Sequence, residues 1–114
     1  MKEFLLLFRF PSNFNASNLS PKEMEGLAKK WKDWVGSIAE QGKFVSSGQR
    51  LASEGKVLKP GGVVTDGPFA EIREILGSFC VVKAESLDDA VTLAHGCPAL
   101  ETGGSVEVRP VFEY

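Results

Sequence analysis

The sequence predicts an α+β fold of the ferredoxin-like type, a mostly antiparallel sheet with two helices on one face. Apolar segments of strand length alternate with two amphipathic helical segments, in the order strand, helix, strand, hairpin, strand, helix, strand. Right-handed crossovers place both helices on the same face of such a sheet. No linker divides the 114 residues, so we expect a single domain over residues 1–114.

The first strand is predicted at Phe4–Phe10, where nearly every residue is apolar and both faces are expected to be buried. A long amphipathic helix is predicted over 21–41, because Ser20 can cap it, Glu23 stands at the capping-box position and Gly42 can end it. Its apolar stripe has helical spacing and consists of Met24, Leu27, Ala28, Trp31, Trp34, Val35 and Ile38.

A second strand is predicted over Phe44–Leu51, interrupted by Gly48. The next two segments, Lys56–Lys59 and Val63–Thr65, are predicted to form a short hairpin around a Pro-Gly-Gly turn. The strand that follows, Ile75–Lys83, is again apolar on both faces.

A shorter helix is predicted after the capping residue Ser86, and Gly96-Cys97-Pro98 is expected to end it. A closing strand is predicted over Ser105–Phe112. The predicted inner stripe of the short helix is Leu87, Ala90, Val91 and Ala94.

Two predicted strands are apolar on both faces, whereas the helices cover only one face of the sheet. An apolar face of this size is rarely left exposed to water. A second copy of the chain, with the two sheets face to face about a two-fold axis, is the simplest cover. The sequence therefore predicts a homodimer.

Charge and composition exclude several function classes. The formal net charge is −2 at pH 7 and the isoelectric point is near 5.4, so we expect no direct nucleic-acid binding. The apolar run Phe4–Phe8 is too short for a signal peptide or for a membrane span of about 20 residues, so we expect a cytoplasmic protein without membrane association. His95 is the only histidine and the two cysteines lack metal-binding spacing, so no metal and no cofactor are predicted.

The most distinctive segment is Val64–Glu71, in which Asp66 ends a strand and begins a rigid turn. A carboxylate fixed there is a candidate catalytic group, and Glu71 and Arg73 are candidate ligand-binding residues beside it. In the alternative interpretation, Asp66 bonds to nearby backbone N–H groups in an Asx turn, and the charged residues form a solvated bend.

Two further side chains are candidates for ligand binding. Trp31 lies on the helical stripe, where its indole N–H could orient a ligand at a cavity edge, although aromatic residues at this spacing also form cores. Arg50, like Arg9 and Arg109, sits beside apolar strand positions, where a guanidinium could hold a carboxylate through two hydrogen bonds. The alternative is that these arginines pair with Glu107 or with an acid of a partner chain.

The segment Asp66-Gly67-Pro68-Phe69, followed by Ala70-Glu71, resembles the signature of the YCII-related family in its DGPF branch. The resemblance extends over essentially the whole chain, including Gly48-Gln49-Arg50-Leu51 and the segment from Gly103 to Pro110. It implies a dimeric α+β barrel. The family's acid/base proposal uses a histidine on the first helix with an aspartate; here Trp31 occupies the histidine's position, and an indole exchanges no proton near neutral pH. Asp66 is the motif residue that this chain retains.

Two hypotheses of function follow. The first is a homodimer with a cleft between helix and sheet that binds a small polar or aromatic molecule, with weak acid/base chemistry, and hence enzymatic activity, left open. The second, suggested by the family resemblance and the missing histidine, is a non-enzymatic regulatory or interaction module linked to a sigma factor or transcription initiation through protein contacts.

Overall fold

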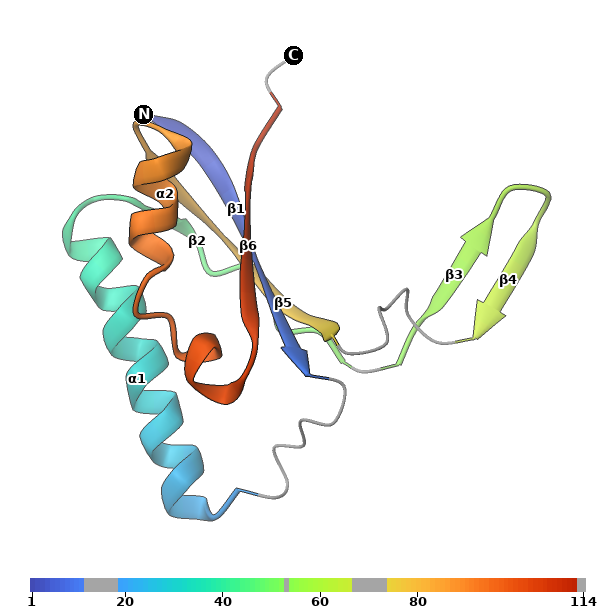
Figure 1. Ribbon diagram of the computed structural model, residues 1–114, viewed down its shortest axis with the longest axis horizontal. Coiled ribbons are helices and arrows are strands. Elements are labelled where there is room, and N and C mark those ends of the chain that lie inside the picture. Colours follow the sequence, from blue (N-terminus) through green and yellow to red (C-terminus); the bar gives the residue numbers. More distant parts are fainter. Residues whose placement is uncertain (12–18, 53, 67–73, 113–114) are drawn as a thin grey trace.

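The structure has the α+β architecture that the sequence predicts, an antiparallel sheet with two helices. A computed structural model describes residues 1–11, 19–52, 54–66 and 74–112. Its four-stranded sheet has the order β2-β5-β1-β6, with every pairing antiparallel, and the helices α1 and α2 connect β1 to β2 and β5 to β6 (Figure 1). The elements are β1 (Lys2–Pro11), α1 (Pro21–Glu40), β2 (Phe44–Ser46), β5 (Glu74–Ala84), α2 (Leu87–Ala94) and β6 (Ser105–Pro110).

Both helices begin at the capping residues that the sequence predicts. The Ser20 hydroxyl accepts a hydrogen bond from the Glu23 N–H at 3.1 Å, and the Glu23 carboxylate accepts one from the Ser20 N–H at 3.2 Å. Ser86 caps α2 through its hydroxyl, which accepts from the Asp89 N–H at 3.1 Å. These bonds satisfy N–H groups that a helix terminus otherwise leaves unpaired. Of the helices that the structure describes, none combines the length and apolar content needed to cross a membrane.

The core lies between the two helices and one face of the sheet. Alternate residues of β1, namely Phe4, Leu6 and Phe8, point into it and meet Trp34 and Ile38 of α1 together with residues of α2. The buried residues of α2 are Ala90, Leu93 and Ala94.

The predicted inner stripe of α2 is wrong at two positions. Leu87 is 47% exposed and Val91 40% exposed, whereas Leu93 is buried. The reason is the packing of α2 against β1, β5 and β6, which buries the side that carries Ala90, Leu93 and Ala94. The Trp34 indole N–H of α1 donates a hydrogen bond to the Leu93 carbonyl oxygen at 3.0 Å.

Two strands end earlier than predicted. β2 stops at Ser46 rather than at Leu51, and β6 stops at Pro110 rather than at Phe112. A short 3-10 helix over Pro98–Thr102, which the sequence analysis did not predict, fills the connection between α2 and β6.

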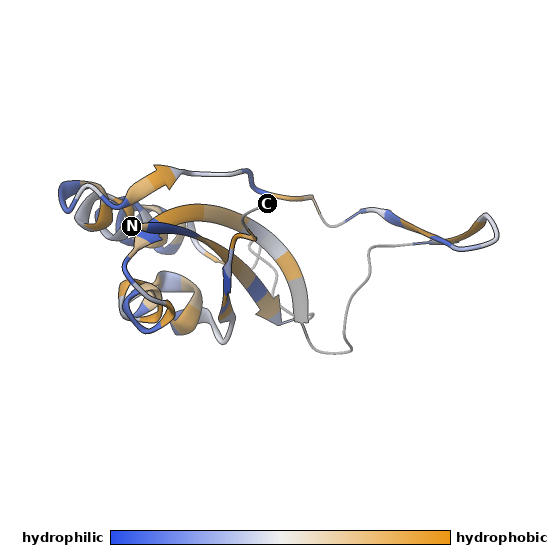
Figure 2. Cartoon of the chain, turned by 90° about the horizontal axis from the view of Figure 1, so that it is seen from above, coloured by the Kyte–Doolittle hydropathy of each residue, from blue (hydrophilic) through white to orange (hydrophobic). Residues whose placement is uncertain are grey.

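The predicted hairpin forms, but it lies apart from the main sheet. Strands β3 (Lys56–Lys59) and β4 (Val63–Asp66) make a separate two-stranded sheet that projects away from the rest of the molecule (Figure 1). Both of its strands carry hydrophobic residues, as the colouring in Figure 2 shows, and Leu58 is 72% exposed.

Candidate ligand-binding pocket

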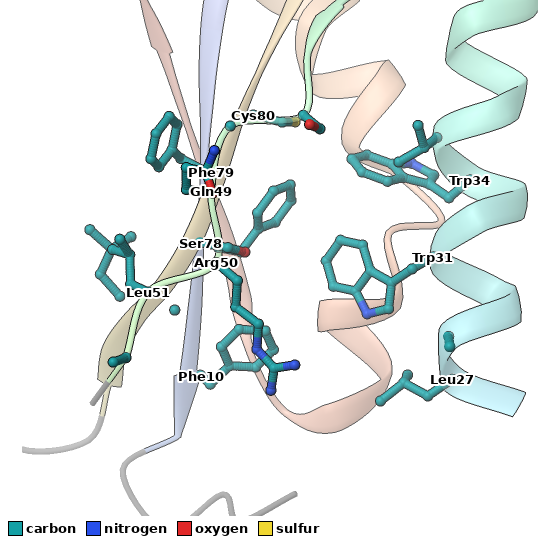
Figure 3. A pocket seen from close by; sticks show the side chains of 18 of the residues that line it. Phe10, Leu27, Trp31, Trp34, Gln49, Arg50, Leu51, Ser78, Phe79 and Cys80 are labelled. Atoms are coloured by element: carbon teal, nitrogen blue, oxygen red, sulfur yellow. The ribbon is translucent and has the colours of Figure 1, made fainter. Parts of the chain in front are cut away.

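A pocket of about 930 Å³ lies between α1, the sheet and the loop 47–52 (Figure 3). Its volume is in the range of roughly 300–1,000 Å³ that is typical of small-molecule sites. The walls are largely apolar, and their aromatic members are Phe8, Phe10, Trp31, Trp34 and Phe44.

Three of these rings hold one another in fixed orientations. The ring centroids of Phe8 and Trp31 are 5.1 Å apart, those of Phe8 and Trp34 5.7 Å, and those of the two indoles 5.8 Å. All three pairs are edge-to-face, with interplanar angles of 84–88°. This is a favoured aromatic geometry, so the aromatic wall is preformed. Trp34 is further held by its hydrogen bond to Leu93.

Trp31 and Arg50 present hydrogen-bond donors at the same end of the pocket. The Trp31 indole nitrogen and the Arg50 guanidinium both point toward the end near Leu27 (Figure 3). Among the described residues, no hydrogen bond engages the Trp31 indole, and the ion pairs involve Arg9, Lys30, Lys56 and Arg109 rather than Arg50. Donors that find no acceptor in the described part of the chain therefore face a largely apolar space.

The backbone of the loop 47–52 sets the position of Arg50. Gly48 has φ +60°, and a Cβ there would overlap the Phe79 carbonyl oxygen, so the loop passes against β5 without room for a side chain. The chain leaves the sheet at this point, which explains why β2 ends early. It returns through a bridge between Arg50 and Ser78 and a hydrogen bond from the Leu51 N–H to the Gly77 carbonyl at 2.7 Å.

The structure brings together two of the residues that the sequence nominates. Trp31 and Arg50 both line the pocket. Asp66 is not among the lining residues; it ends β4, its side chain is 99% exposed, and its carboxylate lies 3.9 Å from the Lys56 ammonium. Its catalytic role stays a prediction, and Glu71 and Arg73 lie outside the described residues.

Sequence reasoning missed Phe10 and Ser78 as pocket residues. The sequence did contain a signal for Phe10, because it lies two residues after Phe8 and therefore on the same, helix-facing side of the first strand. Ser78 gives no such signal, because only the register of β1 with β5 places it opposite Phe8 on that face.

The Cys80 thiol in the pocket wall keeps its proton near neutral pH. Cys80 lines the pocket, and burial raises the pKa of its thiol from 9.0 to about 12. Cys97, which is not among the lining residues, is only 1% exposed, and burial raises the pKa of its thiol to about 11. Among the described lining residues there is no histidine, aspartate or glutamate. The described part of the pocket therefore offers hydrogen bonds and apolar contact rather than acid/base groups.

On the sheet face away from the helices, Arg9, Glu107 and Arg109 form an ionic cluster, called here the Glu107 cluster. The Glu107 carboxylate lies 3.2 Å from the Arg9 guanidinium and 3.1 Å from that of Arg109. Hydrogen bonds from both guanidinium groups, that of Arg109 first, lower the pKa of Glu107. The predicted pairing with Glu107 is thus confirmed for Arg9 and Arg109 but not for Arg50.

Comparison with known proteins gives the family. The chain is 43% identical over 53 residues to a protein of Rhizobium meliloti (strain 1021) that bears the name "Uncharacterized protein R00369". The match covers 46% of this chain and 43% of that protein, so the matched region spans less than half the length of that relative. The sequence profile of the YCII-related domain matches residues 11–114. Since this match includes all but the first ten residues, the chain belongs to the YCII-related family.

Proposed function

We propose that this protein is a homodimer that binds a small polar or aromatic molecule in the pocket between α1 and the sheet. The observation that carries the proposal is the pair of donors on Trp31 and Arg50, for which no described residue supplies an acceptor, at one end of an aromatic-walled pocket (Figure 3). Ligand sites in proteins commonly combine apolar walls with a few placed polar groups.

A purely structural role explains Trp34 but not Arg50. The Trp34 indole is buried and bonded to a backbone carbonyl, as core tryptophans usually are. A guanidinium offers five N–H donors, and an arginine with a structural role would normally direct some of them to a carboxylate or carbonyl. A ligand with an acceptor group would satisfy the donors of Arg50.

The second copy is supported by the sheet face away from the helices, called here the open face. The register of β1 with β5 places Leu5 opposite Val81 and Leu7 opposite Phe79 on this face. The Glu107 cluster lies beside these four apolar side chains. The four lie outside the core cluster and are half-buried, with Gly48 against the Phe79 ring, and a second copy would remove their remaining exposed surface from water.

Acid/base chemistry and the interaction-module hypothesis remain predictions. The described lining residues supply no general acid or base, so any such chemistry would depend on Asp66 or on residues outside the described ranges. The pocket is the observation that favours ligand binding over a link to a sigma factor, because contact with a protein partner needs no preformed aromatic cavity.

The proposed binding is tested by two-dimensional ¹H–¹⁵N spectra of the full chain, which has two tryptophans. Benzoate, benzamide, phenol and benzylammonium are titrated in turn, and we expect at least one to shift the Trp31 indole signal saturably. The variant Ala28→Phe narrows the pocket and is expected to weaken this binding, whereas Ala39→Phe, on an exposed part of α1 away from the pocket, is not. If no probe shifts the signal, the proposed function is contradicted.

A further inference from the structure

The shape of the pocket favours a flat ligand. Phe8, Trp31 and Trp34 form a rigid wall of mutually perpendicular rings, and Phe10 and Phe44 also line the cavity. Aromatic faces and edges attract another aromatic ring through the same quadrupole that orders them here. The volume of about 930 Å³ leaves room for a molecule of one or two fused rings.

The polar end of the pocket favours an anion. Arg50 is the only cation among the described lining residues, no described carboxylate pairs with it, and no described acidic side chain lines the cavity. A positive charge without a counter-charge at the end of an apolar space attracts a negative group. A ligand cation at that end would meet only repulsion from Arg50.

The number and geometry of the donors favour a monocarboxylate. One guanidinium balances one negative charge, and its planar fork matches the two oxygens of a carboxylate. The Trp31 indole N–H points to the same end and can donate a further hydrogen bond to one of those oxygens (Figure 3). A dianionic phosphate would leave one charge uncompensated by the described lining residues.

We infer that the pocket selects a planar aromatic monocarboxylate, whose ring lies against the aromatic wall and whose carboxylate is held by the Arg50 guanidinium and the Trp31 indole N–H. This inference rests on the proposed function, because it names the ligand class of the same pocket.

The test compares benzoate with benzamide, its neutral analogue, and with cyclohexanecarboxylate, its non-aromatic analogue. Dissociation constants come from the same ¹H–¹⁵N titrations, with the two indole signals assigned through Trp31→Phe and Trp34→Phe. We expect benzoate to bind roughly tenfold more tightly than either analogue, since a charge-assisted contact and an aromatic contact are each worth about that factor. The Trp31 indole proton should move downfield with benzoate, whereas the Trp34 proton, already bonded to Leu93, should move little.

The variant Arg50→Gln removes the cation and keeps a donor. It should weaken benzoate about tenfold while leaving benzamide within about twofold, and Arg50→Lys should restore only part of the loss. Lys32→Gln, which removes the same charge from an exposed position of α1 outside the pocket, should leave both probes unchanged. Arg50 is exposed, so the fold should persist, which an unaltered Trp34 indole signal verifies.

Two results would overturn the inference while the proposed binding stands: equal affinity of the wild type for benzoate and benzamide, or equal weakening of both probes by Arg50→Gln. Equal binding of cyclohexanecarboxylate and benzoate would remove the aromatic part of the inference. Failure of every probe to bind contradicts the proposed function itself, and the inference with it.

Discussion

Cys80 and Cys97 show at the scale of single residues how burial changes chemistry. Both thiols are free and buried in the core, and the protonated form is favoured there because a thiolate would lose its hydration. Cys80 thus acts as a small apolar side chain of the pocket wall, although its residue type alone would also allow a nucleophile.

The raised thiol pKa values predict a loss of stability at alkaline pH. In the unfolded chain the thiols ionise near 9.0, whereas in the folded chain they hold their protons to about 12 for Cys80 and about 11 for Cys97. Between these limits the unfolded state binds fewer protons, so the free energy of unfolding falls as pH rises above about 9. Urea unfolding at pH 7 to 11 measures the fall.

The control for this prediction is the double variant Cys80→Ala/Cys97→Ala, which keeps every other titrating group. Its free energy of unfolding should decline less steeply over the same pH range. An identical decline in wild type and double variant would show that the thiols do not contribute.

At the scale of elements, the loop 47–52 explains why Arg50 reaches the pocket. Gly48 occupies the left-handed region, and its Cα lies so close to the Phe79 carbonyl that no Cβ fits. The next residues of the loop pair with β5, since Arg50 forms a bridge with Ser78 and the Leu51 N–H donates to the Gly77 carbonyl oxygen.

We predict that Gly48→Ala destabilises the protein by about 1–3 kcal/mol and weakens benzoate binding, because the loop must move away from β5 and take Arg50 with it. Urea unfolding and the indole titration measure the two effects. Gly26→Ala is the matched control: it lies within α1 with nothing within 4 Å of the added Cβ, and should stabilise by about 0.5–1 kcal/mol. Gly48→Ala as stable as the wild type would contradict this account of the loop.

The same elements show which features were predictable from the sequence. The capping box at Ser20 and the apolar stripe predicted α1 to within one residue at its end, because both signals are local. The end of β2 was not predictable, because it depends on contact between Gly48 and a strand some thirty residues later. The stripe of α2 was misassigned for a similar reason, since its orientation depends on packing against β1, β5 and β6.

The candidate site was also predictable only in part from the sequence. Trp31 and Arg50 could be nominated by residue type and position in the pattern, and the structure places both on one pocket. Their common orientation follows from long-range pairing that no local pattern encodes. Asp66, the candidate from the most distinctive sequence segment, lies instead at the end of β4 in the projecting hairpin, where its carboxylate is exposed.

At the scale of the whole molecule, two surfaces favour association with a second copy. The open face carries Leu5, Leu7, Phe79 and Val81. The β3–β4 hairpin projects from the body with Leu58 and Val64 paired across its strands and both exposed (Figure 1). A two-stranded hairpin is marginally stable by itself in water, so contact with a second copy would stabilise it.

The central claim of this account is that a second copy covers the open face, and a mass measurement by sedimentation in dilute solution tests it directly. We predict particles of twice 12.4 kDa for the wild type and of 12.4 kDa for Leu7→Asp, which places a charge at the centre of the open face. Val91→Asp, on the exposed side of α2, should remain dimeric. A wild-type mass of 12.4 kDa at micromolar concentration would contradict the claim.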